Sequence, residues 1–189
     1  IYVALEKAAP ATVVGLLPVL GRLGGTESAE CAARLAISAN ATVADAAASA
    51  LARWPDRSAQ PSLVMVAAKA TVASARSAAN QAAFRYFERT REVWTAAESS
   101  LVTQLLGATT DAAARKKLVI LLNRAADKPA LALVEKLQSE PALTTAANTA
   151  AQCIAANLAG PPQVRASDSE SSAKNLFDGR TATQWRGPV

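Results

Sequence analysis

The sequence predicts an all-α fold of stacked helix pairs, and three observations carry this prediction. Alanine is the commonest of the 189 residues, and alanine has the highest helix propensity of all residue types. Hydrophobic residues make up 51% of the chain but aromatic residues only 4%, which suits thin layers of closely packed helices better than one deep core. Alternating β-branched runs, which indicate half-buried strands, are missing until the last stretch of the chain.

The first helix of each expected pair is apolar and rich in alanine. We expect such helices over residues 12–23, 43–54, 72–87, 111–125 and 143–158. Each carries an apolar anchor at a similar place, and these anchors recur every 31–37 residues: Leu20, Leu51, Phe84, Leu121 and Ile154. Second helices are expected between them, over residues 28–37, 62–70, 97–106 and 129–138. A helix–turn–helix unit that recurs at this interval is typical of an α-solenoid.

Glycine, proline and aspartate mark the ends of these helices. Gly24 and Gly25 follow the first helix, where glycine takes a left-handed conformation at no steric cost. Pro55 stops the helix before it, because proline cannot continue a helix. Asp111 and Thr110 are candidates for the N-cap of the helix that follows them. Three other prolines lie near helix starts, where a missing N–H costs nothing: Pro61, Pro129 and Pro141.

The expected inward face is clearest in the helix over residues 111–125. Its apolar residues follow 3- and 4-residue spacing: Leu118, Leu121, Leu122 and Ala125. We therefore expect Leu121 to be buried, together with the anchors Leu51 and Ile154.

Three segments resemble HEAT repeats: LLPVLGRLGG at residues 16–25, AAASALARWPD at 46–56 and AAFRYF at 82–87. The resemblance covers about residues 1–159, a range we take as one helical repeat domain. It is closest to the HEAT arrays of large multidomain bacterial proteins of the Planctomycetes and Verrucomicrobia type. In such proteins these arrays are fused to sugar-active, dehydrogenase or haem-binding modules, so the chain is expected to begin inside a longer protein.

The composition changes at residues 160–162, where glycine and two prolines follow the last expected helix. Beyond this linker, residues 163–168 alternate, and we expect a short extended tail of β type in the second unit, residues 160–189. This tail resembles the opening of a discoidin (F5/8 type C) module through six residues: Ala173, Asn175, Asp178, Gly179, Thr183 and Trp185. The start of a bacterial glycosidase-like β-domain is the alternative. The discoidin resemblance implies a periplasmic or extracellular location and possible carbohydrate binding by the complete module.

Several function classes find no support in the composition. The chain has no histidine, so the usual general base and the commonest zinc and haem ligand are missing. Its two cysteines, Cys31 and Cys153, are too few for a thiolate metal site and are expected to be small buried hydrophobic residues. No nucleotide-binding glycine motif and no membrane-spanning apolar run is present. We therefore expect no catalytic residue, no cofactor, no metal and no membrane span.

The candidate binding surface consists of aromatic and basic residues near helix ends. The candidates are Trp54, Arg85, Tyr86, Arg89 and Trp94. The aromatic rings would line a concave groove, although filling gaps between helix layers is the favoured interpretation. A basic groove would draw on six arginines, Arg53, Arg57, Arg76, Arg85, Arg89 and Arg91. The interleaved Asp56, Glu88 and Glu92 favour surface ion pairs instead.

The leading functional hypothesis is a non-catalytic scaffold that presents a surface to protein or carbohydrate-linked partners. Its first rival is a spacer in a multidomain enzyme whose catalytic part lies elsewhere. Its second rival is a HEAT-like nucleic-acid binder, which the net charge of +5 allows but scattered basic residues disfavour. That second rival predicts that most arginines share one face.

Overall fold

The all-α prediction is confirmed by a computed structural model, which describes residues 2, 5, 7–89 and 93–160. Within these residues the chain forms nine α-helices and two short 3-10 helices, and no strand. The α-helices are α2 (Pro10–Leu23), α3 (Gly25–Ala36), α4 (Ala41–Leu51), α5 (Gln60–Lys69), α6 (Ala73–Arg89), α7 (Ala96–Ala108), α8 (Ala112–Leu121), α9 (Lys128–Leu137) and α10 (Thr144–Ala159). The 3-10 helices are η1 (Arg57–Ala59) and η2 (Leu122–Arg124).

Polar side chains begin many of these helices. Asn40, Asp111 and Asp127 each accept a hydrogen bond from the backbone N–H three residues ahead. Thr95 and Glu98 form a reciprocal capping box at the start of α7. Three prolines occupy the first helical positions, Pro10, Pro61 and Pro129, while Pro141 lies in the turn before α10.

Several helix boundaries differ from the sequence prediction by a few residues; for example, the helix expected over residues 111–125 is α8, which ends at Leu121, followed by η2. α3 begins at Gly25 rather than near residue 28, because Gly24 (φ 65°) turns the chain within a single residue. α4 ends at Leu51 rather than at Trp54, and two shorter-range backbone bonds close its last turn. Trp54 donates one of them, to the Leu51 carbonyl.

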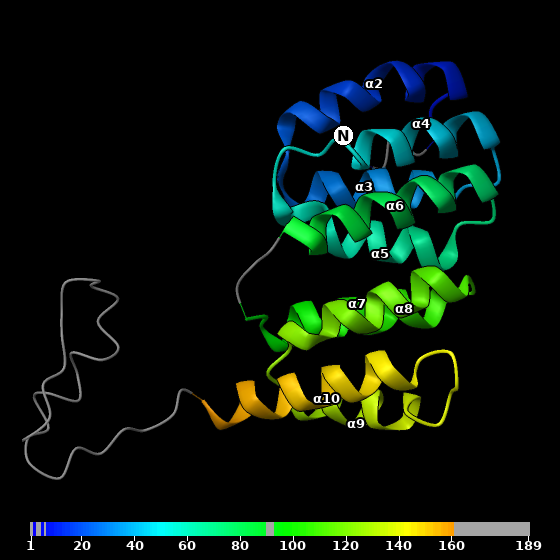
Figure 1. Cartoon of the computed structure of the whole chain (residues 1–189). Helices are drawn as coiled ribbons and strands as arrows, with labels where there is room; N and C mark the ends of the chain where they lie inside the picture. The colour runs from blue at the N-terminus through cyan, green and yellow to red at the C-terminus, as the bar shows by residue number, and fades with distance from the viewer. Residues whose placement is uncertain (1, 3–4, 6, 90–92, 161–189) are drawn as a thin grey trace, which may run out of the picture. The chain divides into compact units, whose positions relative to one another are not determined.

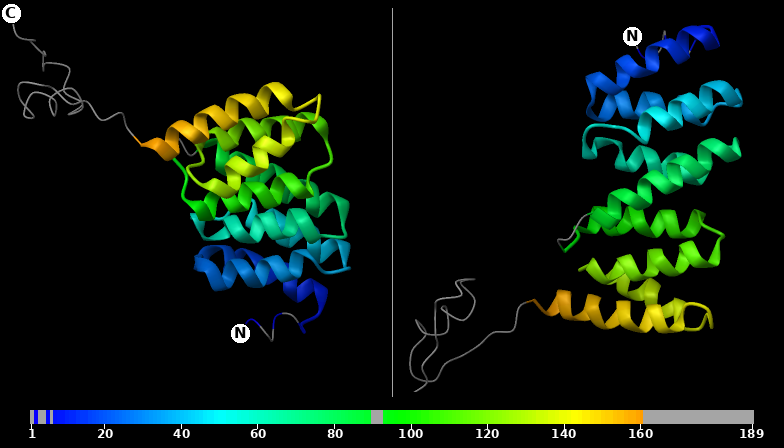
Figure 2. Two further views of the ribbon diagram at one scale, coloured as in Figure 1. Left: turned by 90° about the horizontal axis from the view of Figure 1, so that it is seen from below. Right: turned by 45° about the horizontal axis from the view of Figure 1, so that its top comes forward.

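The helices alternate between two layers (Figure 1). One layer holds α2, α4, α6, α8 and α10, which all run in the same direction, and the other holds α3, α5, α7 and α9, which run in the opposite direction (Figure 2). The larger contacts join a helix to the next one, as between α3 and α4 or between α5 and α6, and to the next-but-one, as in the series α2–α4–α6–α8 and α3–α5–α7–α9. The closest backbone approaches lie among α2 to α6. One consequence is that the C-terminal ends of α2, α4, α6 and α8 lie along the same edge.

Alanine provides much of the interface between the layers. Fully buried alanines line α3, α4 and α6, where a small side chain lets two backbones approach closely. Of the five anchors, Leu20, Leu51, Leu121 and Ile154 are buried, as is the whole stripe of α8 and η2. Phe84 is only half-buried, because Phe87, one turn further along α6, fills the interior instead.

The two cysteines differ in burial. Cys31 is buried, as expected, whereas Cys153 is half-exposed on α10, so the expectation of burial is wrong for this residue. Both are free thiols.

One face of α2 remains apolar and uncovered among the described residues. Leu16, Val19 and Leu23 are 42%, 47% and 64% exposed, and their spacing places them on one side of the helix. The neighbouring side of α2 carries its buried residues, Val13, Leu17 and Leu20.

The C-terminal tail lies outside the described residues from position 161 onward. The predicted extended tail and its discoidin resemblance fall there. Residues 1–158 form one compact unit, to which the residues from 159 onward do not belong. None of the helices in the described part is long and apolar enough to span a membrane.

Candidate binding surface

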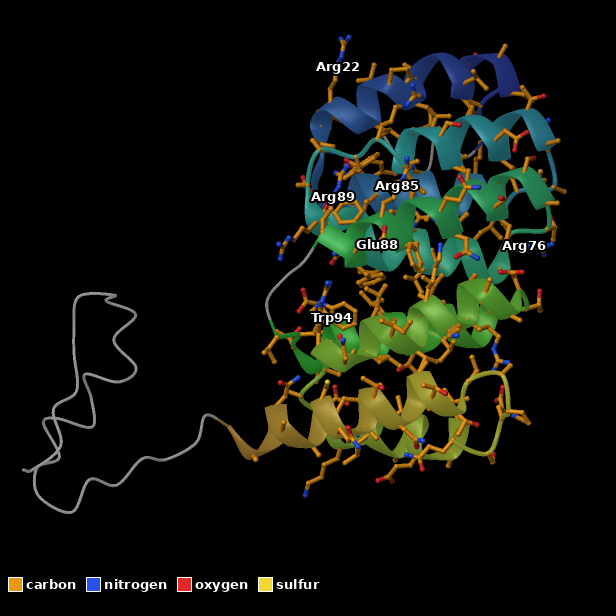
Figure 3. All side chains as sticks on the ribbon, in the orientation of Figure 1. Arg22, Arg76, Arg85, Glu88, Arg89 and Trp94 are labelled. Atoms are coloured by element: carbon orange, nitrogen blue, oxygen red, sulfur yellow. The ribbon has the colours of Figure 1, made fainter. Side chains whose placement is uncertain are left out.

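A hollow of about 590 Å³ lies where the C-terminal ends of α4 and α6 meet the turn that follows α4. Four arginines line it: Arg53, Arg57, Arg85 and Arg89. Figure 3 shows Arg85 and Arg89 at the same edge of the helical unit, near the end of α6. Residues 53 and 57 come from the turn after α4, so the close packing of α4 against α6 brings the two pairs together.

The guanidinium groups of Arg85 and Arg89 are available to a ligand. These residues are one helical turn apart on α6, and both are exposed. Neither forms an ion pair with another residue that the structure describes. Their charges therefore remain uncompensated by direct contact within the described chain.

The other two arginines of the hollow are only partly engaged. Arg53 donates from Nε to the Ser49 carbonyl at 3.2 Å, which holds its side chain against the end of α4. Arg57 lies 4.0 Å from the Glu98 carboxylate, and its side chain is 66% exposed. An ion pair that long and exposed contributes little to stability, so Arg57 can exchange Glu98 for another anion.

Asp56 is the acidic residue within the hollow, and it is committed to the turn. Its carboxylate accepts hydrogen bonds from the backbone N–H of Ser58 at 2.8 Å and of Gly25 at 3.4 Å. Hydrogen bonds from Ser58, first from its side chain and then from its backbone, lower the pKa of Asp56 below its ordinary value. Asp56 thus remains charged at neutral pH, and its oxygens are bonded to backbone N–H groups of the turn. The four arginines therefore give the hollow an excess of positive charge.

Tyr86 joins α6 to the same turn. Its hydroxyl donates a hydrogen bond to the backbone carbonyl of Asp56. Burial, followed by the nearby Asp56 charge, raises the pKa of Tyr86. The phenol is therefore neutral at physiological pH and fixes the position of the turn relative to Arg85 and Arg89.

A second hollow, of about 750 Å³, adjoins the first between α2 and α4. The two hollows share Arg53 and Pro55 in their walls. The second hollow is mostly apolar, with Val14, Leu17 and Pro18 on the α2 side and small residues of α4 opposite them. Together they form a surface across α2, α4 and α6 that is apolar in one part and cationic in the other. We call it the α2–α6 groove.

The structure separates the five predicted surface residues into two groups. Arg85, Tyr86 and Arg89 line the cationic hollow and form the first group. The two tryptophans form the second group, although Trp54 also borders this hollow. Trp54 and Trp94 are only 5% and 3% exposed, so neither ring is a surface residue, and filling gaps between the helix layers is their role.

Trp94 lies outside both hollows of the groove. Its ring packs on Phe87 with ring centres 5.6 Å apart, and the Arg124 guanidinium lies 5.9 Å from the ring centre. The same guanidinium donates a hydrogen bond to the Phe87 carbonyl at 2.8 Å. Trp94 therefore stabilises the edge between α6 and η2.

The remaining arginines do not join the groove as a continuous track. Arg76 lies at the opposite end of α6 (Figure 3), and Arg115 is bonded to Glu140. Arg91 and Glu92 lie outside the described residues. Surface ion pairs join Arg57 to Glu98 and Arg115 to Glu140, and neither uses Asp56 or Glu88, the described acids among those expected to pair.

Sequence reasoning missed one arginine of the groove, Arg22, although it named Arg53 among the arginines of a possible basic groove. Arg22 stands two residues after the anchor Leu20, and Arg53 stands two residues after Leu51, so the repeat places both at equivalent positions. The apolar residues of α2 that face α4 were also missed, because the unbroken apolar composition of this helix does not distinguish its buried side from its groove side.

The chemistry available at the groove is binding by charge and apolar contact. The part of the chain that the structure describes contains no group of histidine, cysteine, aspartate or glutamate residues arranged to hold a metal ion. No family model, no curated protein and no solved structure matches the chain.

Proposed function

We propose that this chain is a HEAT-like α-solenoid that acts as a non-catalytic binding module of a larger protein, with the α2–α6 groove as its binding surface. The observation that carries the proposal is the parallel arrangement of α2, α4 and α6, which lines up two adjoining hollows across successive helices. Helical repeat proteins bind partners on such surfaces because stacking extends one surface over many repeats.

The properties of the groove support a protein partner. Its two hollows combine apolar walls with exposed arginines, and arginine is enriched in protein–protein interfaces. The walls come from helices with buried alanine-rich inner faces, so the surface rests on a rigid support. Tyr86 and Asp56 additionally fix the turn that separates the hollows.

A peptide library displayed on phage tests this proposal. Peptides are first selected on the wild-type chain and then tested on a variant in which Ala46→Trp and Ala50→Trp fill the apolar hollow. Both alanines line that hollow and are partly exposed, so the larger rings can be accommodated without entering the core. The matched control is Ala132→Trp, which places a tryptophan on the exposed side of α9.

We expect selected peptides to bind the wild-type and Ala132→Trp chains and to lose binding to the filled-groove variant. Peptides that bind all three chains equally would place the binding surface elsewhere. If selection yields no peptide that depends on the groove, the spacer hypothesis explains the chain better. Circular dichroism of each variant checks that its helices are intact.

A further inference from the structure

We infer that the partner of the α2–α6 groove is an acidic peptide segment, bound through carboxylates at Arg85 and Arg89 with a neighbouring apolar side chain in the hollow between α2 and α4. This inference rests on the proposed function and specifies the chemistry of the partner. It starts from the imbalance of charge in the cationic hollow, where four guanidinium groups face the single carboxylate of Asp56.

The geometry of the four arginines suits carboxylates. A guanidinium group presents a planar fork of N–H donors that matches the two oxygens of a carboxylate. Arg85 and Arg89 are one turn apart on α6, and Arg53 and Arg57 face them across the hollow. Two acidic side chains of one peptide can therefore each meet a separate arginine pair.

The acidic groups that the structure describes beside the hollow do not satisfy these arginines. Asp56 uses its oxygens on the backbone N–H groups of Ser58 and Gly25. Glu98 accepts hydrogen bonds from the backbone and hydroxyl of Thr95 at 2.9 and 3.0 Å, and it is 4.0 Å from Arg57. An incoming carboxylate would thus displace few existing ion pairs when it binds these arginines.

The apolar hollow favours a peptide over a nucleic acid. Val14, Leu17 and Pro18 offer a surface for an aliphatic side chain beside Arg22 and Arg53, and a phosphodiester backbone has no apolar group to place against these three residues. Binding of single strands also relies on exposed aromatic rings for base stacking. Trp54 and Trp94 are buried, and the Tyr86 ring is half-buried with its hydroxyl bonded to the chain.

The test measures binding of fluorescein-labelled synthetic peptides by fluorescence anisotropy. The acidic probe contains two glutamates and a leucine separated by short spacers, and the matched probe replaces both glutamates by glutamine. The proteins are the wild-type chain, the double variant Arg85→Gln/Arg89→Gln, and Arg76→Gln as the control. Arg76 belongs to the same helix but lies at its other end (Figure 3), and all three arginines are exposed, so each variant is expected to fold.

We expect the acidic probe to bind the wild-type chain and the Arg76→Gln control alike, within about twofold. The double variant is expected to lose about tenfold or more in affinity, because charge-assisted hydrogen bonds at an interface are its main contacts. Affinity is also expected to fall between about 50 mM and about 300 mM salt, because ions screen exposed charges. The glutamine probe is expected to bind the wild-type chain no better than the double variant.

Three results would overturn the inference. One is equal affinity of the acidic probe for the wild-type and double-variant chains. Another is a loss of affinity in the Arg76→Gln control as large as the loss in the double variant. The third is tighter binding of a single-stranded DNA oligonucleotide than of the acidic probe, with the same dependence on Arg85 and Arg89. If neutral peptides selected from a library still depend on Ala46 and Ala50, the groove remains a binding surface and only the acidic partner is excluded.

Discussion

Arg115 donates two hydrogen bonds to Glu140, from Nη1 to Oε2 at 2.8 Å and from Nη2 to Oε1 at 3.1 Å. Arg115 lies near the start of α8, and Glu140 lies in the turn between α9 and α10. The pair therefore joins two successive helix pairs, and its fork-to-fork geometry is the strong form of an ion pair.

Glu140→Gln should lower the free energy of unfolding by about 0.5–1 kcal/mol, since both side chains are partly exposed and solvent screens the charges. Urea denaturation followed by circular dichroism measures the change, which should shrink at about 1 M salt. Glu135→Gln, on an exposed position of α9, is the control and should have almost no effect. An equal loss in both variants would show that the Arg115 contact adds no stability of its own.

Leu51→Ala should lower the free energy of unfolding by about 2–5 kcal/mol, because Leu51 is fully buried and its truncation leaves a cavity. Leu16→Ala is the matched control, since Leu16 is 42% exposed on α2. Thermal and urea unfolding of the two variants should differ clearly. A loss below about 1 kcal/mol for Leu51→Ala would contradict the assignment of the inward face.

Much of the helical structure could be predicted from sequence because it depends on local signals. The repeat of anchors and the positions of Gly24, Pro61 and Asp111 locate helices that the structure contains. Phe84 was taken as the anchor of its helix, whereas Phe87 is the residue that fills the interior, because only packing decides between two aromatic residues one turn apart.

Less of the binding groove could be predicted from the sequence. Arg53 and Arg85 are 32 positions apart, and their convergence depends on how closely α4 approaches α6. The burial of Trp54 and Trp94 likewise depends on tertiary contacts, since an aromatic residue at a helix end can face either way. Arg85 and Arg89 form no ion pair with Asp56 or Glu88, whereas Glu92 lies outside the described residues.

Thr95→Ala should lower the free energy of unfolding by about 1 kcal/mol, because it removes the side chain that caps α7. Thr110→Ala, at an exposed position just before the N-cap Asp111, is the control and should have a smaller effect. Amide hydrogen exchange in the first turn of α7 should become faster in Thr95→Ala alone. Unchanged exchange there would show that the capping box does not stabilise this helix.

Asp56→Asn should change the pH dependence of stability at acid pH. The pKa of Asp56 is lower in the folded chain than its ordinary value, so the charged group adds stability above the ordinary pKa and loses it as pH falls through the folded pKa. The urea midpoint of the wild type should therefore exceed that of Asp56→Asn at pH 7. The difference should shrink below about pH 3. A constant difference over that range would mean that titration of Asp56 does not contribute.

Deletion of residues 161–189 should leave the circular dichroism and melting temperature of the helices nearly unchanged. Residues 1–158 form a compact unit of their own, and the core described above lies entirely within it. A matched measurement on the full chain provides the reference. Loss of cooperative melting on deletion would show that the C-terminal residues belong to the helical unit.

The nearest-neighbour contacts of the stack have a mechanical consequence. Because the helices from α2 to α9 are joined chiefly to near neighbours along the chain, tension between the ends of the stack is shared among many interfaces in series, each of which yields a little. The backbones approach most closely from α2 to α6, so the extension is expected to concentrate in the more loosely joined helices from α7 onward. The helical unit would then behave as a spring with a stiff end and a compliant end, and the α2–α6 groove lies in the stiff end.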